Sequence, residues 1–253
     1  MSELHDPAGN TPQGAPPGRS ATHIALRTAF ILLAFTLAFT ALMASVHYLT
    51  APRVAASAQT EKLRLIAVVL APTIYNNHLL NDAITLPPTG ALGTTENTLL
   101  YRARKNNQPA ALVFEAVAPD GYAGKINLLL AVAHTGELLA LRVTQHKETP
   151  GLGDYIDPKK DRNKTRPWIN QFDHLGFDRV PVEKWRVKKD GGHFDQMAGA
   201  TISARAVANA SGRALAWANQ HREALFALPP KAQYPNTEAL TEVPPEKPGV
   251  IHE

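Results

Sequence analysis

The stretch "KINLLLAVAHTGELLALRVTQ", Lys125 to Gln145, decides the fold class of this chain. It holds two short apolar runs, "KINLLLAVA" and "ELLALRVTQ", separated by only His134-Thr135-Gly136. Short apolar runs bounded by a glycine-containing turn are typical of β-strands. A connection this short joins antiparallel strands, because parallel strands need a long crossover. The sequence therefore predicts an antiparallel hairpin at this point.

Two further strands precede the hairpin. "TLLYRARK" (Thr98 to Lys105) and "AALVFEAVA" (Ala110 to Ala118) are separated by a turn at 106–109, and a second turn at Pro119 to Gly124 leads into the hairpin. Four strands joined by short turns predict an antiparallel meander. One face of such a sheet needs a cover, so we expect an α+β domain whose antiparallel sheet packs on helices.

Two helices are expected to flank the sheet. Residues 55–80 place Leu63, Ile66, Val69 and Leu70 at spacings of three and four, and Pro72 should break or kink that helix. The stretch 85–93 then reads as a loop. The second helix runs from Thr201 to about Leu225, with a face of small residues that permits close packing. These residues are Ala206, Ala210, Ala214 and Ala218.

The region between sheet and last helix has a mixed pattern. Residues 157–167 form a charged loop, typical of a solvated surface, and Trp168 to Phe172 suits a short helix. Residues 184–194 suit a strand followed by a turn around Asp190-Gly191-Gly192.

The segment Thr28 to Leu49 contains no Asp, Glu, Lys or Arg. As a helix it would be roughly 33 Å long, enough to cross the hydrocarbon core of a membrane. The alternative is a cleaved signal peptide, whose apolar core is normally shorter. Basic residues flank both ends, so the positive-inside rule does not set the orientation. We expect a disordered tail at 1–20, an anchor at 21–50, a folded domain at 51–227 and a disordered tail at 228–253.

Composition excludes several classes of function. The net charge of +4 is spread along the chain without an aromatic-lined basic stripe, so nucleic-acid binding is not expected. The chain has no cysteine, which excludes disulfides, thiolate nucleophiles and cysteine-held metal or iron–sulfur centres. Redox chemistry would need an organic cofactor, or a metal held by histidine and carboxylate.

The first candidate site is "HKETPGLGDYI", His146 to Ile156, directly after a predicted strand. Its proline and glycines favour a loop whose backbone can approach a ligand closely, and Glu148 and Thr149 add polar groups. His146 and Glu148 could suggest a metal. Two ligands are too few, so a surface or supporting role for His146 is the favoured interpretation.

The second candidate site is "DQMAGATIS", Asp195 to Ser203. Gly199 and Ala200 leave little bulk beside Thr201, at a helix start that would favour a phosphate. The residues alone favour a plainer role, in which Thr201 is the N-cap of the helix. A hydrolase using Thr201 is a weaker alternative, because nothing aims a base such as His193 at its hydroxyl.

Several motifs in one order resemble a known family, the G subunit of the Rnf (Rsx) ion-translocating electron transport complex. They are "YNN" (75–77), "APDGYAGKINLLL" (118–130), "HKETPGLGD" (146–154), "WRVKKDGGHFDQ" (185–196) and "GATIS" (199–203). The related C subunit of the sodium-pumping quinone reductase shares the "ETPGLG" and "GAT" elements, but the "PDGY" turn and the "KKDGG" stretch look more like the Rnf subunit. Ala198 departs from the family pattern, which usually has Ser or Thr before the glycine.

The resemblance implies an FMN-binding domain with FMN attached covalently, through its phosphate, to Thr201. A separate flavin transferase, using FAD, would carry out the attachment, so Thr201 needs no catalytic base and the chain has no catalytic residue of its own. The motif also implies flavin contacts from Glu148, Thr149, Leu152 and Gly153 and from Gly199 and Ala200, with no metal.

The resemblance further implies a single-pass protein of the inner membrane, with its flavin domain in the periplasm. It would carry electrons within a ferredoxin- and NAD-linked ion-translocating complex and contact the other Rnf subunits. The alternative function is a membrane-tethered binding module without cofactor.

Overall fold

The computed structural model describes residues 21–235, apart from the side chains of residues 21 and 52–58. Residues 1–20 and 236–253 of the two expected tails therefore lie outside the described residues. The chain divides into two units between Ala58 and Gln59.

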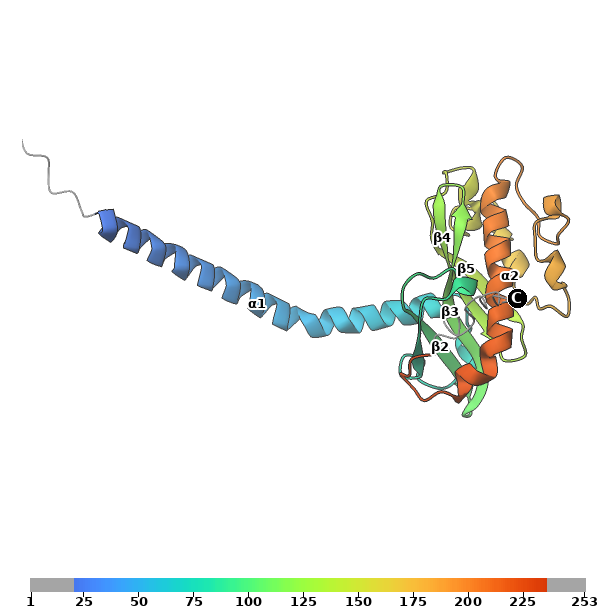
Figure 1. Ribbon diagram of the computed structural model, residues 1–253, viewed down its shortest axis with the longest axis horizontal. Coiled ribbons are helices and arrows are strands. Elements are labelled where there is room, and N and C mark those ends of the chain that lie inside the picture. Colours follow the sequence, from blue (N-terminus) through green and yellow to red (C-terminus); the bar gives the residue numbers. More distant parts are fainter. Residues whose placement is uncertain (1–20, 236–253) are drawn as a thin grey trace, which may run out of the picture. The chain divides into compact units, whose positions relative to one another are not determined.

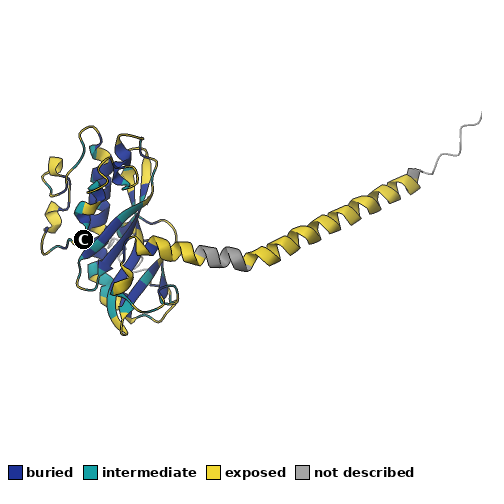
Figure 2. Ribbon diagram, turned by 180° about the vertical axis from the view of Figure 1, so that it is seen from behind, coloured by how far each residue is buried: buried dark blue, intermediate teal, exposed yellow. Residues whose placement is uncertain are grey.

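The first unit contains most of helix α1, Ala21–Ala67. Its Thr22–Ala51 portion is long and apolar enough to cross a membrane. The residues whose burial is described there are all exposed, and this part of the ribbon is yellow in Figure 2. They include Phe30, Phe35 and Phe39. Four hydroxyls in this portion, beginning with Thr28, donate to the carbonyl four residues earlier, so these four polar groups are satisfied within the helix. A helix that is apolar all round suits a lipid environment.

The second unit is built on a five-stranded antiparallel sheet in the order β1-β2-β3-β4-β5. Strands β2 to β5 are labelled in Figure 1. The predicted meander is confirmed, with one strand added at its start. The strands are β1 Ala83–Leu86, β2 Thr98–Lys105, β3 Gln108–Gly121, β4 Gly124–Ala133 and β5 Leu138–Gln145.

Both faces of the sheet are covered, which explains why β4 is apolar at nearly every position. Alternate residues of a strand point to opposite faces. Leu128 and Leu130 of β4 belong to the larger core cluster, on the side of the C-terminal helix. Leu129 and Ala131 belong to a second cluster with Ile66, Val69 and Leu70, at and just after the end of α1.

Helix α2, Thr201–Ala227, packs on the sheet chiefly at β3 (Figure 1). The predicted small-residue face is the buried one. Its four alanines, at 206, 210, 214 and 218, are at most 1% exposed, and their lack of bulk allows the helix to approach the sheet closely.

Three local expectations were wrong. Helix α1 ends at Ala67 rather than near residue 80, and a short 3-10 helix follows at Pro72–Ile74. Leu63 was expected on the apolar face of α1, but this residue is 40% exposed. The expected loop 85–93 overlaps β1 and a 3-10 helix at Gly90–Leu92. Residues 184–194 form no strand, because Gly191, with φ of +78°, turns the chain so that only an isolated bridge joins Val187 and Phe194. The short helix at Trp168–Phe172 is present as a 3-10 helix.

The C-terminal tail was expected to begin at residue 228, and this prediction was also wrong. Residues 231–234 instead run beside β1, where Lys231 N–H donates to Ala83 O at 2.8 Å and Tyr234 N–H donates to Thr85 O at 2.8 Å. Tyr234 is 9% exposed. The physical reason is the exposed edge of β1, whose unpaired backbone groups need partners.

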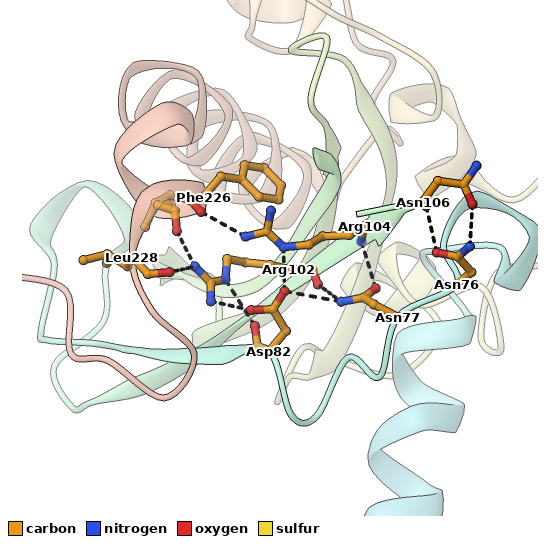
Figure 3. Close-up of polar contacts among 9 residues, drawn as sticks. Asn76, Asn77, Asp82, Arg102, Arg104, Asn106, Phe226 and Leu228 are labelled. Atoms are coloured by element: carbon orange, nitrogen blue, oxygen red, sulfur yellow. Dashed lines mark hydrogen bonds and ion pairs between the residues drawn. The ribbon is translucent and has the colours of Figure 1, made fainter. Parts of the chain in front are cut away.

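A cluster of polar side chains ties β2 to the end of α2 (Figure 3). The Arg102 side chain is fully buried and donates to the Asp82 carboxylate and to the carbonyls of Leu225 and Leu228. Arg104 donates to Asp82 Oδ2 at 2.8 Å and to Phe226 O at 2.9 Å. The last carbonyls of a helix have no intrahelical partners, so the two arginines supply the missing donors.

Candidate functional site

Three segments of the second unit enclose a cavity of about 220 Å³. They are the turn between β3 and β4, the loop after β5, and the start of α2. The cavity is lined by Tyr122, Glu148, Thr149, Leu152, Gly153, Gly199, Ala200, Ile202 and Ser203.

Glu148 joins the three segments. Its side chain is buried, with the residue 4% exposed. Its Oε1 accepts a hydrogen bond from Ala123 N–H at 3.1 Å, in the β3–β4 turn. Its Oε2 accepts one from the hydroxyl of Ser203, in the first turn of α2. A buried carboxylate needs such partners, so this pair of bonds fixes the walls of the cavity relative to one another.

Gly153 is required by this arrangement. A Cβ at this position would stand 2.5 Å from Ser203 Oγ and 2.8 Å from Glu148 Oε2. These distances are below van der Waals contact, so any larger residue would push the two side chains apart. The second glycine of the "PGLG" stretch is thus explained by close approach of the loop to α2.

The rest of the loop is held by its own backbone. The N–H groups of Leu152 and Gly153 both donate to Thr149 O at 3.1 Å. Gly151 has φ of +76°, a left-handed conformation that suits glycine, and its N–H donates to Asp154 Oδ1 at 2.9 Å. Leu152 at the loop tip is left 51% exposed beside the cavity.

Tyr155 fixes the segment that leads into α2. Its hydroxyl accepts a hydrogen bond from Met197 N–H and donates one to Ala200 O, both at 3.2 Å. Burial raises the pKa of Tyr155 above its ordinary value, so the phenol stays neutral and keeps its proton for Ala200. Gly199, with φ of +84°, makes the bend, and nothing lies within 4 Å of where its Cβ would be.

Thr201 is the first residue of α2 and not its cap. Ala200 holds the N-cap position, without a side-chain hydrogen bond, so the interpretation of Thr201 as the cap is wrong. Thr201 is half-buried between Ala200 and Ile202, which both line the cavity. Within residues 21–235, its hydroxyl has no hydrogen-bond partner, so no base is bonded to it as the hydrolase alternative would need.

A cation lies one helical turn after Thr201. Residues four apart lie on the same helix face, which places Arg205 beside Thr201. Its guanidinium is held by Asp190, with Nε to Oδ2 at 2.5 Å and Nη2 to Oδ1 at 2.8 Å. The hydrogen bond from Arg205 lowers the pKa of the Asp190 carboxyl, so this ion pair is in place across the neutral pH range.

The structure gives His146 a local role. Its Nδ1 accepts a hydrogen bond from the N–H of Glu148 at 3.1 Å. Across the described residues, no group of three or more His, Asp or Glu side chains could hold a metal ion.

Six of the seven sequence-predicted residues line one cavity. The seventh, Thr201, does not line it but stands in the chain between two residues that do, Ala200 and Ile202. The sequence did not predict Tyr122, Ile202 or Ser203. Tyr122 lies within the singled-out "APDGYAGK" stretch, so a signal for it existed. A signal for the role of Ser203 did not, because its partner Glu148 is 55 residues away in the chain.

Comparison with known proteins matches two families on different parts of the chain. Residues 121–216, which include the whole cavity, match the FMN-binding domain, and residues 21–69 match the RnfG N-terminal region.

Curated relatives match almost along their full length. The G subunit of the ion-translocating oxidoreductase complex of Shewanella piezotolerans is 36% identical, covering 83% of this chain and 97% of the relative. The corresponding G subunits of Pseudomonas aeruginosa and Vibrio cholerae are 40% and 37% identical, each covering 80% of this chain and 92% and 94% of the relative. The resemblance to this family is thereby confirmed.

The cavity accordingly belongs to an FMN-binding domain, and the apolar helix Thr22–Ala51 suits the single-pass anchor of a protein in a membrane complex. The chain belongs to the family of G subunits of ion-translocating oxidoreductase complexes.

Proposed function

We propose that this protein carries electrons through FMN attached covalently to Thr201, with the flavin ring in the cavity between Tyr122 and Ser203. The observation that carries the proposal is the Thr201 hydroxyl, which has no hydrogen-bond partner within residues 21–235 and belongs to a residue flanked in the chain by two that line the cavity. The FMN would supply one-electron redox chemistry, with a potential set by nearby charges and hydrogen bonds.

The size and lining of the cavity suit the ring of FMN. Its volume of about 220 Å³ lies below the roughly 300 Å³ at which pockets for whole drug-sized ligands begin. The ring would therefore occupy the cavity, while the ribityl phosphate stays outside, beside Thr201. Leu152 and Ile202 offer apolar contacts, and Thr149 offers a hydroxyl to a polar edge of the ring.

The surroundings of Thr201 suit the phosphate. The first N–H groups of a 27-residue helix, together with its dipole, favour an anion at this end. Arg205 lies on the same helix face, but its charge is already paired with Asp190. An ester phosphate at Thr201 would thus have its electrostatic support from the start of the helix.

Attachment would be carried out by a second enzyme, since no base is hydrogen-bonded to the Thr201 hydroxyl in the described part of the chain. A flavin transferase would take FAD as donor. The Thr201 hydroxyl would lose its proton and form an O–P bond to the phosphate of the FMN half, while AMP leaves. The threonine then remains as an inert linkage.

We also infer that the flavin domain lies on the periplasmic side of the inner membrane, and that electrons pass between ferredoxin and NAD through the complex. Resemblance to the G subunits of Rnf complexes supports both inferences. The other proteins of the complex would be the electron donor and acceptor.

Mass spectrometry tests the covalent attachment. The full-length chain is expressed with a flavin transferase and digested. We expect the peptide that contains Thr201 to gain the mass of FMN minus water, while the same peptide made without the transferase stays unmodified. An unmodified Thr201 peptide in the presence of the transferase would favour the cofactor-free binding module instead.

Glu148→Gln is expected to raise the midpoint potential of the bound flavin by roughly tens of millivolts, because it removes a negative charge from the cavity wall and so favours the more negative reduced flavin. Glutamine keeps an oxygen for Ala123 N–H, so the fold is preserved. Spectroelectrochemical titration of the flavin-loaded protein measures the shift.

The matched control is Glu115→Gln, which removes an exposed carboxylate from β3. By strand alternation Glu115 shares the face of Ala111 and Val113, away from α2 and the cavity. The midpoint potential of the flavin in Glu115→Gln should therefore stay at the wild-type value. Equal shifts in both variants would mean that the effect of Glu148 is not local to the cavity.

A further inference from the structure

Large apolar side chains are exposed on all three segments around the cavity. Tyr122 is 68% exposed, Leu152 51% and Ile202 43%. All three line the cavity, and Tyr122 is the one aromatic residue among the nine that do. Ligand pockets are typically lined by apolar and aromatic side chains, so this exposure is what a site for a flat ring would have before it is filled.

The backbone of Tyr122 is fixed although its ring is exposed. Tyr122 and Ala123 form the tip of a two-residue turn, closed by the pairing of Gly121 with Gly124. Gly124, which follows the two turn residues, has φ of +122°, a conformation that favours glycine. The neighbouring Ala123 N–H is bound to Glu148. The turn therefore holds the aromatic side chain at the cavity without packing it against the core.

We propose that Tyr122 is a flavin-binding residue, whose phenol ring stacks on one face of the FMN ring, with Leu152 and Ile202 on the other side. This inference rests on the proposed place of the flavin ring in the cavity. Two flat π-systems in contact are favourable in an offset-stacked arrangement. Burial of the ring of Tyr122 would also remove the most exposed of the three apolar side chains from water.

Flavin fluorescence of the full-length, FMN-loaded protein tests the stacking. A tyrosine in contact with a flavin quenches its emission by transferring an electron to the excited ring. We expect Tyr122→Leu and Tyr122→Phe to raise emission per flavin several-fold and to lengthen its lifetime. Tyr122→Trp should restore quenching, because indole is also readily oxidised. Flavin content is measured by mass for each variant, so that emission is compared per attached FMN.

Tyr101→Phe is the matched control. Tyr101 lies on β2 and packs against the core cluster on the far face of the sheet, so loss of its hydroxyl should leave emission unchanged. Emission at the wild-type level in both Tyr122→Leu and Tyr122→Phe would overturn the proposal. So would an equal rise in Tyr101→Phe, since the effect would then not depend on contact.

Nitration of tyrosine gives a second readout that needs no fluorescence. Peptide mapping should show that Tyr122 reacts readily in the flavin-free protein and is protected after FMN loading. Protection that arises only within the assembled complex would overturn stacking and indicate contact with another protein of the complex.

If the wild type gains no covalent FMN, the proposed attachment fails by itself. Free FMN is then titrated, and stacking predicts that Tyr122→Leu binds FMN more weakly than the wild type does. Equal affinity of this variant and the wild type would overturn it.

Discussion

Thr201→Ala is expected to abolish covalent FMN, so that the denatured protein shows no flavin fluorescence in a gel and no added mass on the peptide containing residue 201. The substitution removes the oxygen that would form the phosphoester. The fold should survive, because Ala200 and not Thr201 holds the cap position, and alanine is the best helix former. We expect the free energy of unfolding to change by no more than about 0.5 kcal/mol.

Two hydroxyl variants separate loss of the acceptor from general damage. Thr201→Ser keeps an oxygen at the same place and should retain attachment. Ser203→Ala should also retain it, because the Ser203 hydroxyl donates to Glu148 and faces the cavity. Flavin that stays attached in Thr201→Ala would exclude this residue as the acceptor. Loss in Ser203→Ala alone would move the linkage to that serine.

Local sequence patterns predicted the centre of the sheet well and its edge poorly. Thr98 to Lys105 was predicted with its observed bounds, because short turns and apolar runs are local signals. Strand β1 was missed because it is four residues long and depends on distant partners, pairing with β2 on one side and with residues near Gln233 on the other. The same long-range pairing explains why the chain stays ordered past residue 228.

The candidate site was predictable only in part, for a similar reason. Glycines and small residues indicated the two loops, because a backbone that approaches its neighbours closely requires such residues and they can be recognised in the local sequence. The residues alone nevertheless favoured Thr201 as a cap, and the ordered family motifs were needed to suggest otherwise. What could not be predicted is the junction itself, in which one carboxylate, Glu148, binds both the β3–β4 turn and α2.

Arg102 shows the limit of pattern reading most clearly. It lies within "TLLYRARK", and the pattern of apolar and polar residues in that strand does not predict which groups a buried arginine would bind. In the structure its side chain is 0% exposed and joins Asp82, 20 residues before it, to carbonyls at the end of α2, more than 120 residues after it. The sheet and the helix that carries Thr201 thus share one buried ionic centre.

Arg102→Met is expected to lower the free energy of unfolding of the second unit by about 3–5 kcal/mol, because Asp82 loses its fully buried partner and keeps only Arg104 and Asn77, while the carbonyls of Leu225 and Leu228 lose their donor. Methionine fills much of the same volume, so most of the loss is electrostatic. All three tryptophans of the chain, at 168, 185 and 217, lie in this unit, so urea unfolding followed by tryptophan fluorescence reports on it in the full-length protein in detergent.

The control is another arginine–aspartate pair in the same unit. Arg142 also binds both carboxylate oxygens of Asp173, at 2.9 and 3.1 Å, but the two side chains are 18% and 20% exposed. Water can replace the lost partner there, so Arg142→Met should cost only on the order of 1 kcal/mol. Equal losses in the two variants would contradict the role given to burial. A double variant, Arg102→Met with Asp82→Asn, should recover part of the loss, because no buried carboxylate is then left without its main partner.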